Sequence, residues 1–424
     1  MLPELITKII RRCLAGPDQD FSFRAAQDVD PGPVQKTGLY IHIPFCKNLC
    51  PYCPYNKIGY EEKLVEPYLN ALLAEVELYY QRIGRAEISS IYIGGGTPTN
   101  LTDELGIVLN RIRERFRLTG DICVETSPGD LDRERVGKLL QYGVSLLSLG
   151  GQSFDNRYLK LLGRNYTAAV LEHSIELALN AGFKSVNLDL MFALPGQTTA
   201  EVERDLARAV CSGVDQVTTY PLFSFPYTTV GRYRKLKKVK MPNLATRRKM
   251  YRAIHSFFLE HGFQRVSVWG FLRGEAPRYS SVTRERYIGL GAGAGSHVPG
   301  VFYLNTFSVE EYIKSCRSGR LPVALSMNFT EMMTLYYWLY WRLYDTYIPK
   351  QQLFELFGEG NRKLKLLLRL LYGFKMAVDE GEQIALNERG AFWLHLMQNY
   401  FALPYINKVW SAARETAYPE RVKL

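Results

Sequence analysis

The chain has 424 residues, 47% of them hydrophobic, and its 53 basic and 42 acidic residues give a formal net charge of +11. This length exceeds one average domain, and the apolar content supports a large packed core and excludes a disordered chain. The seven cysteines are an odd number without regular spacing, so they give no paired disulfide framework.

Residues 1–37 are expected to form an N-terminal helix and a lead-in segment. The apolar side chains at its start share one helical face: Leu2, Leu5, Ile6, Ile9, Ile10 and Cys13. This stretch lacks the continuous apolar core of a signal peptide, and it either packs on the body of the protein or lies on a membrane surface. The most apolar run, residues 332–341, is too short to span a bilayer, so no integral membrane segment is expected.

Three cysteines follow a short alternating stretch that predicts a buried strand at residues 39–43. Pro44 ends the strand, so Cys46, Cys50 and Cys53 are expected on a loop at its C-terminal end. Three thiols at the spacing C-x3-C-x2-C suit a metal centre better than a disulfide, because an odd number cannot pair and such short spacing strains a bridge.

No fourth Cys or His stands near the three cysteines at a spacing that is usual for metal ligands, and this helps to decide which metal centre they hold. A zinc site needs another Cys or His, and the local candidate, His42, stands on the strand four residues before Cys46. A four-iron cluster with three thiolates and one open iron fits better, while a zinc knuckle or a simple ferredoxin-like site is the alternative. The remaining cysteines are scattered and are expected to be small buried hydrophobic residues: Cys13, Cys123, Cys211 and Cys316.

Residues 38–225 alternate short β-type runs with longer helical patterns, which predicts a parallel α/β sheet. The expected strands are residues 39–43, 88–93, 121–125, 146–149, 185–190 and 216–220. The expected helices include residues 64–82, 105–116, 132–142 and 168–181. Ligands of such sheets collect at the C-terminal ends of the strands. The residues that stand at or after those ends are Gly94, Gly95, Gly96, Thr97, Glu125, Gln152, Arg164 and Asp189.

Several longer matches accompany the cysteines: YIHIPFC before them, GGGTP after the second strand, GGQSF after the fourth and LPGQT after the fifth. Together these motifs resemble the oxygen-independent coproporphyrinogen III oxidase-like family of radical S-adenosylmethionine (SAM) enzymes. That family also includes haem chaperones, class C methyltransferases and anaerobic haem-degrading enzymes. The resemblance covers nearly everything after residue 37. It implies an α/β fold, a partial (β/α)6 barrel over residues 38–225 with a small, mainly helical C-terminal domain, and a [4Fe-4S] cluster that reductively cleaves SAM.

The resemblance also implies a role for each matched residue. Cys46, Cys50 and Cys53 would hold the cluster, and its open iron would chelate the amino and carboxylate groups of SAM. The remaining positions would bind SAM: Gly94, Gly95, Gly96 and Thr97 at the amino group, Glu125 at the methionine part, Arg164 at the carboxylate, Gln152 and Asp189 at the ribose, and Tyr52 at the adenine. Tyr40 either faces the active site or is an interior side chain of the barrel.

Residues 226–300 are expected to extend the barrel, and residues 301–424 to form the helical C-terminal domain. In the extension, YIGLGAGAGSHV at residues 287–298 resembles a family segment over the active site. Its glycines would admit a planar ligand or a second SAM molecule, or would simply pack a tight loop. Near Thr330, an N-cap candidate, a long aromatic-rich helix is expected to begin, and a helix, a hairpin and another helix to follow it.

A basic cluster spans GRYRKLKKVK at residues 231–240 and continues with Arg247, Arg248 and Lys249. It could bind an acidic electron donor, substrate carboxylates or nucleic acid, or form a solvated face. No nucleic-acid-binding module is readable, so nucleic acid is not expected as a partner. The expected partners are a flavodoxin- or ferredoxin-type electron donor and a small planar aromatic substrate, in the reducing cytoplasm that an oxygen-sensitive cluster requires.

Departures from the family's branches guide the choice of reaction. Decarboxylating coproporphyrinogen oxidases usually follow the third cysteine with x-Cys, where this chain has Pro54 and Tyr55, and it lacks their tyrosine/proline-rich N-terminal segment. Haem chaperones carry H-N-x-x-Y-W before the glycine-rich segment, but residues 276–286, APRYSSVTRER, contain no histidine. TRER at 283–286 looks like the anaerobic haem-degrading methyltransferases, although a surface helix start would have the same residues. The hypothesis is therefore C-methylation or radical remodelling of a tetrapyrrole with two SAM molecules, with decarboxylation and haem carriage as alternatives.

Overall fold

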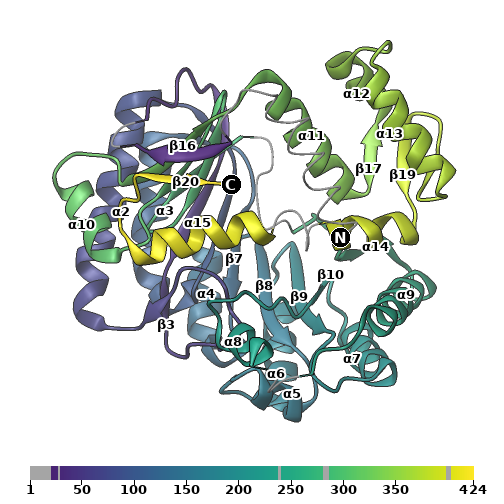
Figure 1. Cartoon of the computed structure of the whole chain (residues 1–424). Helices are drawn as coiled ribbons and strands as arrows, with labels where there is room; N and C mark the ends of the chain where they lie inside the picture. The colour runs from purple at the N-terminus through teal and green to yellow at the C-terminus, as the bar shows by residue number, and fades with distance from the viewer. Residues whose placement is uncertain (1–20, 27–28, 237–239, 280–285, 398–402) are drawn as a thin grey trace.

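The computed structural model describes residues 21–26, 29–236, 240–279, 286–397 and 403–424. The helix expected over residues 2–13, Cys13 and most of the TRER motif lie outside the described residues. Figure 1 shows a curved sheet with helices on its outer side and a smaller lobe, containing α12 (Lys350–Phe357) and α13 (Arg362–Gly373), that stands apart from it.

Six parallel strands form the centre of the sheet and lie side by side in chain order. They are β2 (Lys36–Ile43), β5 (Glu87–Gly95), β7 (Ile122–Thr126), β8 (Leu146–Gln152), β9 (Ser185–Phe192) and β10 (Gln216–Pro221). Most of their side chains are buried, as expected for parallel strands that are covered on both faces. The strands expected from the sequence and the α/β fold class are confirmed.

Helices connect these strands along the outside of the sheet (Figure 1). They are α2 (Glu62–Ile83), α3 (Thr102–Arg115), α4 (Arg133–Gln141), α5 (Asn156–Leu161), α6 (Ala168–Asn180) and α7 (Thr199–Ser212), with short 3-10 turns η1 (Pro98–Leu101) and η2 (Pro128–Asp130). Side-chain caps fix where several begin, including a capping box of Thr198 and Glu201 at α7. The last turn of α7 corrects one expectation. Cys211 is exposed because the buried face of that helix carries Val202, Asp205, Leu206 and Ala209.

The sheet continues beyond both edges of the barrel. Next to β2 follow β13 (Tyr287–Leu290), β14 (Gly295–Val298), β15 (Val301–Asn305), β16 (Val323–Asn328), β1 (Ser22–Ala25) and β20 (Arg421–Lys423); next to β10 lie β12 (Gly270–Arg273) and β11 (Phe263–Arg265). A boundary at residue 301 therefore does not coincide with a break in the sheet. Because β15 and β16 pair with each other and with β14 and β1, residues 301–328 belong to the extension rather than to a helical domain.

The C-terminal lobe follows the expected order of elements. Thr330 caps α11 (Glu331–Asp345), and α13 is followed by the hairpin of β18 (Ala377–Asp379) and β19 (Gln383–Leu386) and by α14 (Glu388–Met397). The other elements are α8 (Thr229–Lys235), α9 (Leu244–Glu260), α10 (Val309–Arg317), α15 (Leu403–Glu415), β3 (Phe45–Cys46), β4 (Ile58–Gly59), β6 (Arg117–Leu118) and β17 (Tyr347–Pro349). Over the part of the chain that is described, no helix has both the length and the apolar character that a bilayer crossing requires.

Glu75 of α2 joins the barrel to the sheet extension through a fully buried carboxyl group. It accepts hydrogen bonds from the Gly291 amide (2.8 Å), the Asn305 Nδ2 (2.7 Å) and the Tyr312 hydroxyl (2.7 Å). Burial raises the pKa of Glu75 to about 7, although these three donors favour its ionised form. The folded protein therefore holds a proton here at pH values where an unfolded chain has released it.

This raised pKa predicts a pH-dependent stability. Between about pH 5 and 7 the folded state binds more protons at Glu75 than the unfolded state, so the free energy of unfolding falls as pH rises. Glu75→Gln removes this proton exchange. Denaturant titrations under anaerobic conditions at pH 5 and pH 8 should show the wild type losing about 2 kcal/mol relative to the variant over that interval. The exposed Glu66→Gln on the same helix is the control. Equal pH dependence in the wild type and Glu75→Gln would contradict this role of Glu75.

Candidate active site

Cys46 ends β3, beside the C-terminal end of β2, and Cys50 and Cys53 lie on the loop that leads from β3 to β4; this stretch is called the cysteine loop. Cys46 is buried, Cys50 and Cys53 are half-buried, and all three are free thiols. The Lys57 ammonium donates to the carbonyl groups of Cys50 (2.9 Å) and Cys53 (3.0 Å), and the Thr97 hydroxyl lies 3.8 Å from the Cys46 sulfur. The loop is thus held through its backbone, which leaves the thiols available as ligands.

His42 does not complete a mononuclear metal site. Its Nε2 lies 2.8 Å from the carbonyl oxygen of Asn56, which can only accept, so this nitrogen carries the proton. Its Nδ1 then accepts from the Tyr40 hydroxyl at 2.7 Å, and burial lowers the pKa of His42 to about 4. In the described parts of the chain no three His, Cys, Asp or Glu side chains converge on one ion. Both ring nitrogens of His42 are engaged in hydrogen bonds, so the fourth ligand that a zinc site needs does not come from His42.

The glycine triplet brings the end of β5 against the cysteine loop. Gly95 has a φ of +115°, and a Cβ atom there would lie 2.6 Å from the His42 ring. A Cβ atom at Gly96 would lie 2.7 Å from the Phe45 carbonyl oxygen, and one at Gly94 2.7 Å from a Glu125 oxygen. These contacts require glycine at all three positions and place Thr97 beside Cys46.

Two carboxyl groups face the barrel interior near the loop. Glu125, at the end of β7, accepts hydrogen bonds from the Tyr92 hydroxyl and the Gly95 amide, and burial raises its pKa. Asp189, on β9, accepts from Asn187 at 2.9 Å; burial, and then the charge of Glu125, raise its pKa to about 7. Two buried carboxyl groups whose pKa values are raised by burial are suited to an added cation or to hydroxyl groups.

Arg164 supplies the opposite charge at the same mouth of the barrel. Its Nη2 donates to the Tyr52 hydroxyl at 2.6 Å, whereas its buried Nε has no hydrogen-bond partner among the described groups. None of the ion pairs between described residues includes Arg164. An arginine fork with a buried, unused donor is suited to an anion such as a carboxylate. Tyr52 itself is 7% exposed and positions Arg164; its contact with adenine stays a prediction.

Gln152 occupies an unusual backbone conformation at the end of β8. Its φ is +65°, a left-handed value that costs on the order of 1 kcal/mol for a residue other than glycine and is often found at functional sites. The Tyr220 hydroxyl donates to its Oε1 at 2.7 Å. The Tyr40 hydroxyl bonds His42 and its ring stacks on Tyr92 at 6.0 Å, which are contacts inside the barrel; its role at the active site stays a prediction.

These side chains fit the two expected cofactors. SAM carries an ammonium group, a sulfonium group, a carboxylate and ribose hydroxyls, and the site offers two carboxyl groups and one unpaired guanidinium beside three free thiols. The glycine-rich segment is less open than expected. Cβ atoms at Gly291 and Gly293 would meet the His42 carbonyl oxygen at 2.4 Å and the Asn56 Nδ2 at 2.9 Å. Close packing of the backbone against His42 of β2 and against Asn56 therefore explains these two glycines.

Several residues of this site were not singled out from the sequence. Lys57 stands four residues after Cys53 and could have been noticed as a cation close behind the third cysteine. Tyr92 and Tyr220 hold Glu125 and Gln152, and Arg414 of α15 donates to the Pro54 (2.7 Å) and Tyr55 (3.0 Å) carbonyl groups. Tyr92 stands two residues before the glycine triplet and could have been noticed there, whereas Tyr220 and Arg414 come from distant parts of the chain.

The basic cluster divides into two parts with different surroundings. Arg247 lies 2.9 Å from His395 Nε2, and Arg248 makes a two-pronged ion pair with Glu388, so both arginines attach α14 to α9. The cations of α8 are exposed instead.

Comparisons with known proteins agree with this geometry. The family model described as the radical SAM superfamily matches residues 40–209. The heme chaperone HemW of Bacillus subtilis (strain 168) is 32% identical over 281 residues, covering 65% of this chain and 74% of that protein. The anaerobilin synthase of Escherichia coli O157:H7 is 28% identical over 306 residues, covering 70% of this chain and 69% of that protein.

A solved structure shows the same fold. Coproporphyrinogen III oxidase (HemN) from Escherichia coli, described as a radical SAM enzyme, superposes with a TM-score of 0.74 at 20% identity, covering 93% of this chain and 98% of that one. The chain therefore belongs to the oxygen-independent coproporphyrinogen III oxidase-like family of radical SAM enzymes, whose cofactors are a [4Fe-4S] cluster and S-adenosylmethionine.

Proposed function

We propose that this radical SAM enzyme acts on a tetrapyrrole and methylates or remodels its ring, with one SAM molecule as radical source and a second as carbon donor. The substrate class is supported by the relatives, since the names of two of them refer to haem and to coproporphyrinogen. The departures at Pro54 and Tyr55 and the absence of the chaperone's histidine motif favour ring chemistry over decarboxylation or carriage.

A [4Fe-4S] cluster held by the three cysteines would supply the one-electron reduction that cleaves SAM. The residues of the protein bind the cluster and bind and orient SAM. Cys46, Cys50 and Cys53 hold the cluster, Glu125 accepts the SAM amino group, and Arg164 pairs with its carboxylate. The ribose hydroxyls bond Gln152 and Asp189, and Tyr40, Tyr52, Gly94, Gly95, Gly96 and Thr97 complete the SAM site.

One observation carries the choice of a flat substrate. The Tyr55 side chain is 53% exposed two residues after Cys53, and Trp410 lies against it with ring centroids 6.0 Å apart. Behind Trp410 stand Phe225, stacked at 6.2 Å, and Phe307 at 6.2 Å. We name Tyr55, Phe225, Phe307 and Trp410 the aromatic wall. Tyr55 and the half-buried Trp410 are its accessible rings next to the cysteines, the buried Phe225 and Phe307 support them from behind, and accessible aromatic rings of this kind hold planar rings by stacking.

The position of the wall also bears on the decarboxylase alternative. The residue that replaces the family's extra cysteine is Tyr55 itself, and Arg414 fixes its backbone. A stacking ring therefore stands where the decarboxylating relatives have a thiol. The 32% identity to a heme chaperone keeps haem binding without SAM cleavage as the second candidate function.

A labelled-methyl assay tests the proposal. The reconstituted, dithionite-reduced protein is incubated anaerobically with SAM labelled in its methyl group and with haem or a porphyrin, and the pigments are separated. We expect label in a tetrapyrrole product, and none when Cys46→Ala replaces the wild type. If 5′-deoxyadenosine forms but label never reaches the acceptor, methyl transfer is wrong. Loss of carboxyl groups from coproporphyrinogen would support the decarboxylase, and haem binding without cleavage the chaperone.

A further inference from the structure

Helix α8 lies directly against the cysteine loop. The Val230 amide at its start donates to the Pro51 carbonyl oxygen at 3.3 Å, and Pro51 follows Cys50. The Val230 side chain packs in the apolar cluster that contains Tyr52 and borders Cys50. Just before the helix, the Tyr227 hydroxyl reaches the Pro54 carbonyl oxygen at 3.5 Å. The helix and the residues before it therefore contact the cysteine loop at two places: at Pro51, between Cys50 and Cys53, and at Pro54, directly after Cys53.

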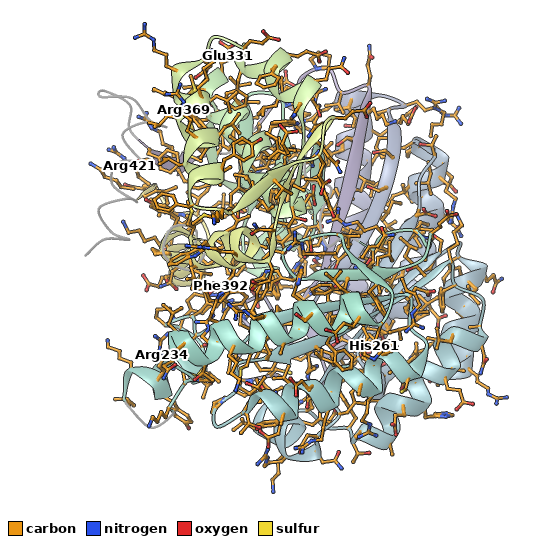
Figure 2. All side chains as sticks on the ribbon, turned by 90° about the vertical axis from the view of Figure 1, so that its right-hand side faces the viewer. Arg234, His261, Glu331, Arg369, Phe392 and Arg421 are labelled. Carbon is orange, nitrogen blue, oxygen red and sulfur yellow. The ribbon has the colours of Figure 1, made fainter. Side chains whose placement is uncertain are left out.

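The outer face of α8 is basic and open to solvent. Arg232, Arg234 and Lys235 are all exposed, and no ion pair between described residues involves any of them. Arg234 donates one hydrogen bond to the Ser224 hydroxyl, and Figure 2 shows it at the outer end of the helix, at the edge of the molecule. This half of the basic cluster thus differs from Arg247 and Arg248, whose charges are used inside the protein.

Apolar side chains accompany these cations. Tyr233 is 46% exposed and Leu236 63% exposed on and just after α8, while Leu49 in the cysteine loop is 51% exposed. The Asn48 side chain bonds the Gly163 carbonyl oxygen, which holds this part of the loop beside the end of α5. A surface that combines exposed apolar side chains with cations is suited to binding a negatively charged protein.

We propose that the face formed by Leu49, Arg232, Tyr233, Arg234, Lys235 and Leu236, here named the α8 face, docks the acidic one-electron carrier protein that reduces the cluster. This inference rests on the proposed function, because SAM cleavage needs an electron from outside. Electron transfer weakens steeply with distance, so a carrier is best placed where the cysteine loop reaches the surface. The α8 face meets this requirement through the Val230–Pro51 contact.

Other occupants fit the α8 face less well. A small carboxylated substrate is held by groups that converge on a concave site, whereas these cations extend from the outside of a helix. A one-electron carrier of the flavodoxin or ferredoxin class needs only a small, transient interface, and charge complementarity gives it speed and orientation. Arg232, Arg234 and Lys235, three exposed cations within about one helical turn, match an acidic surface of that kind.

The test compares two triple variants of the whole enzyme that lose the same charge. One is Arg232→Gln/Arg234→Gln/Lys235→Gln in α8. The other is Arg362→Gln/Lys363→Gln/Lys365→Gln, three exposed cations of α13 in the separate lobe. Binding of an acidic flavodoxin is measured at low and moderate salt. The rate of 5′-deoxyadenosine formation is measured with reduced flavodoxin and, separately, with dithionite.

We expect the α8 variant to bind flavodoxin about tenfold more weakly, because electrostatic steering is lost. It should therefore need about tenfold more reduced flavodoxin to reach the same rate of 5′-deoxyadenosine formation. Its rate with dithionite should be unchanged, and the α13 variant should match the wild type. Wild-type binding should weaken as salt rises. Unchanged binding by the α8 variant, equal losses in both variants, loss of the dithionite rate, or tighter wild-type binding to an RNA fragment would each overturn the proposal. If dithionite drives no cleavage even in the wild type, the proposed function fails, whereas the binding measurement still decides the docking face.

Discussion

We expect Cys46→Ala to abolish the iron–sulfur chromophore and all SAM cleavage. Cys46 is the buried member of the three thiols, and its sulfur lies 3.8 Å from the Thr97 hydroxyl at the end of the glycine-rich strand. Only three protein thiols stand on this loop, so losing one leaves an iron without a protein ligand and a cluster that cannot be retained. The brown absorbance after reconstitution and the yield of 5′-deoxyadenosine with dithionite are the measurements.

Cys211→Ala is the matched control for this prediction. Cys211 is an exposed thiol at the end of α7, far from the loop in sequence and not engaged by the site. We expect this variant to retain both the colour and the cleavage. A Cys46→Ala protein that keeps a four-iron spectrum, or a Cys211→Ala protein that loses it, would show that the cluster is held elsewhere.

We expect Arg164→Ala to weaken SAM binding about a hundredfold, or about 3 kcal/mol, because a charged two-pronged hydrogen bond to the carboxylate would be lost in a desolvated site. The buried and partnerless Nε marks this guanidinium as the group that lacks a ligand. Lysine cannot reproduce the planar fork, so Arg164→Lys should still bind about tenfold more weakly. Equilibrium binding of SAM to the reconstituted, unreduced protein measures both effects.

The control for Arg164 comes from the same connection between β8 and α6. Arg157 is an exposed arginine on α5 that pairs with Glu201, and Arg157→Gln should bind SAM like the wild type. If Arg164→Ala binds SAM normally, the carboxylate is held by another group. If Arg157→Gln weakens binding as much, the effect is one of overall charge.

The barrel could be predicted in detail because each of its strands and helices is marked by a pattern of neighbouring residues in the sequence. Short apolar strands alternate with helical patterns, and parallel strands bring their C-terminal ends to one edge, so Cys46, Glu125 and Asp189 could be expected to meet before any contact was known. The same local signals placed the cap of α11 at Thr330.

Contacts between distant segments could not be predicted in this way. Arg414 reaches the backbone of Pro54 and Tyr55 across most of the chain, and Glu75 of α2 accepts from Gly291 and Tyr312. From the sequence alone, a glutamate on a helix such as Glu75 is predicted to be exposed, because its buried hydrogen-bond partners lie far away in the chain. The continuation of the sheet past residue 301 was missed for a related reason, because β15 and β16 are short strands and β16 pairs with β1 from the opposite end of the described chain.

The central claim is that this site cleaves SAM in order to act on a tetrapyrrole. Its most direct test is the amount of 5′-deoxyadenosine formed by the reconstituted enzyme with dithionite and SAM under anaerobic conditions, with and without haem or a porphyrin, beside Cys46→Ala. We predict that one of these tetrapyrroles raises the yield several-fold above the level with SAM alone, and that the variant forms none. A wild type that binds the tetrapyrrole yet forms no more 5′-deoxyadenosine than Cys46→Ala would contradict the claim.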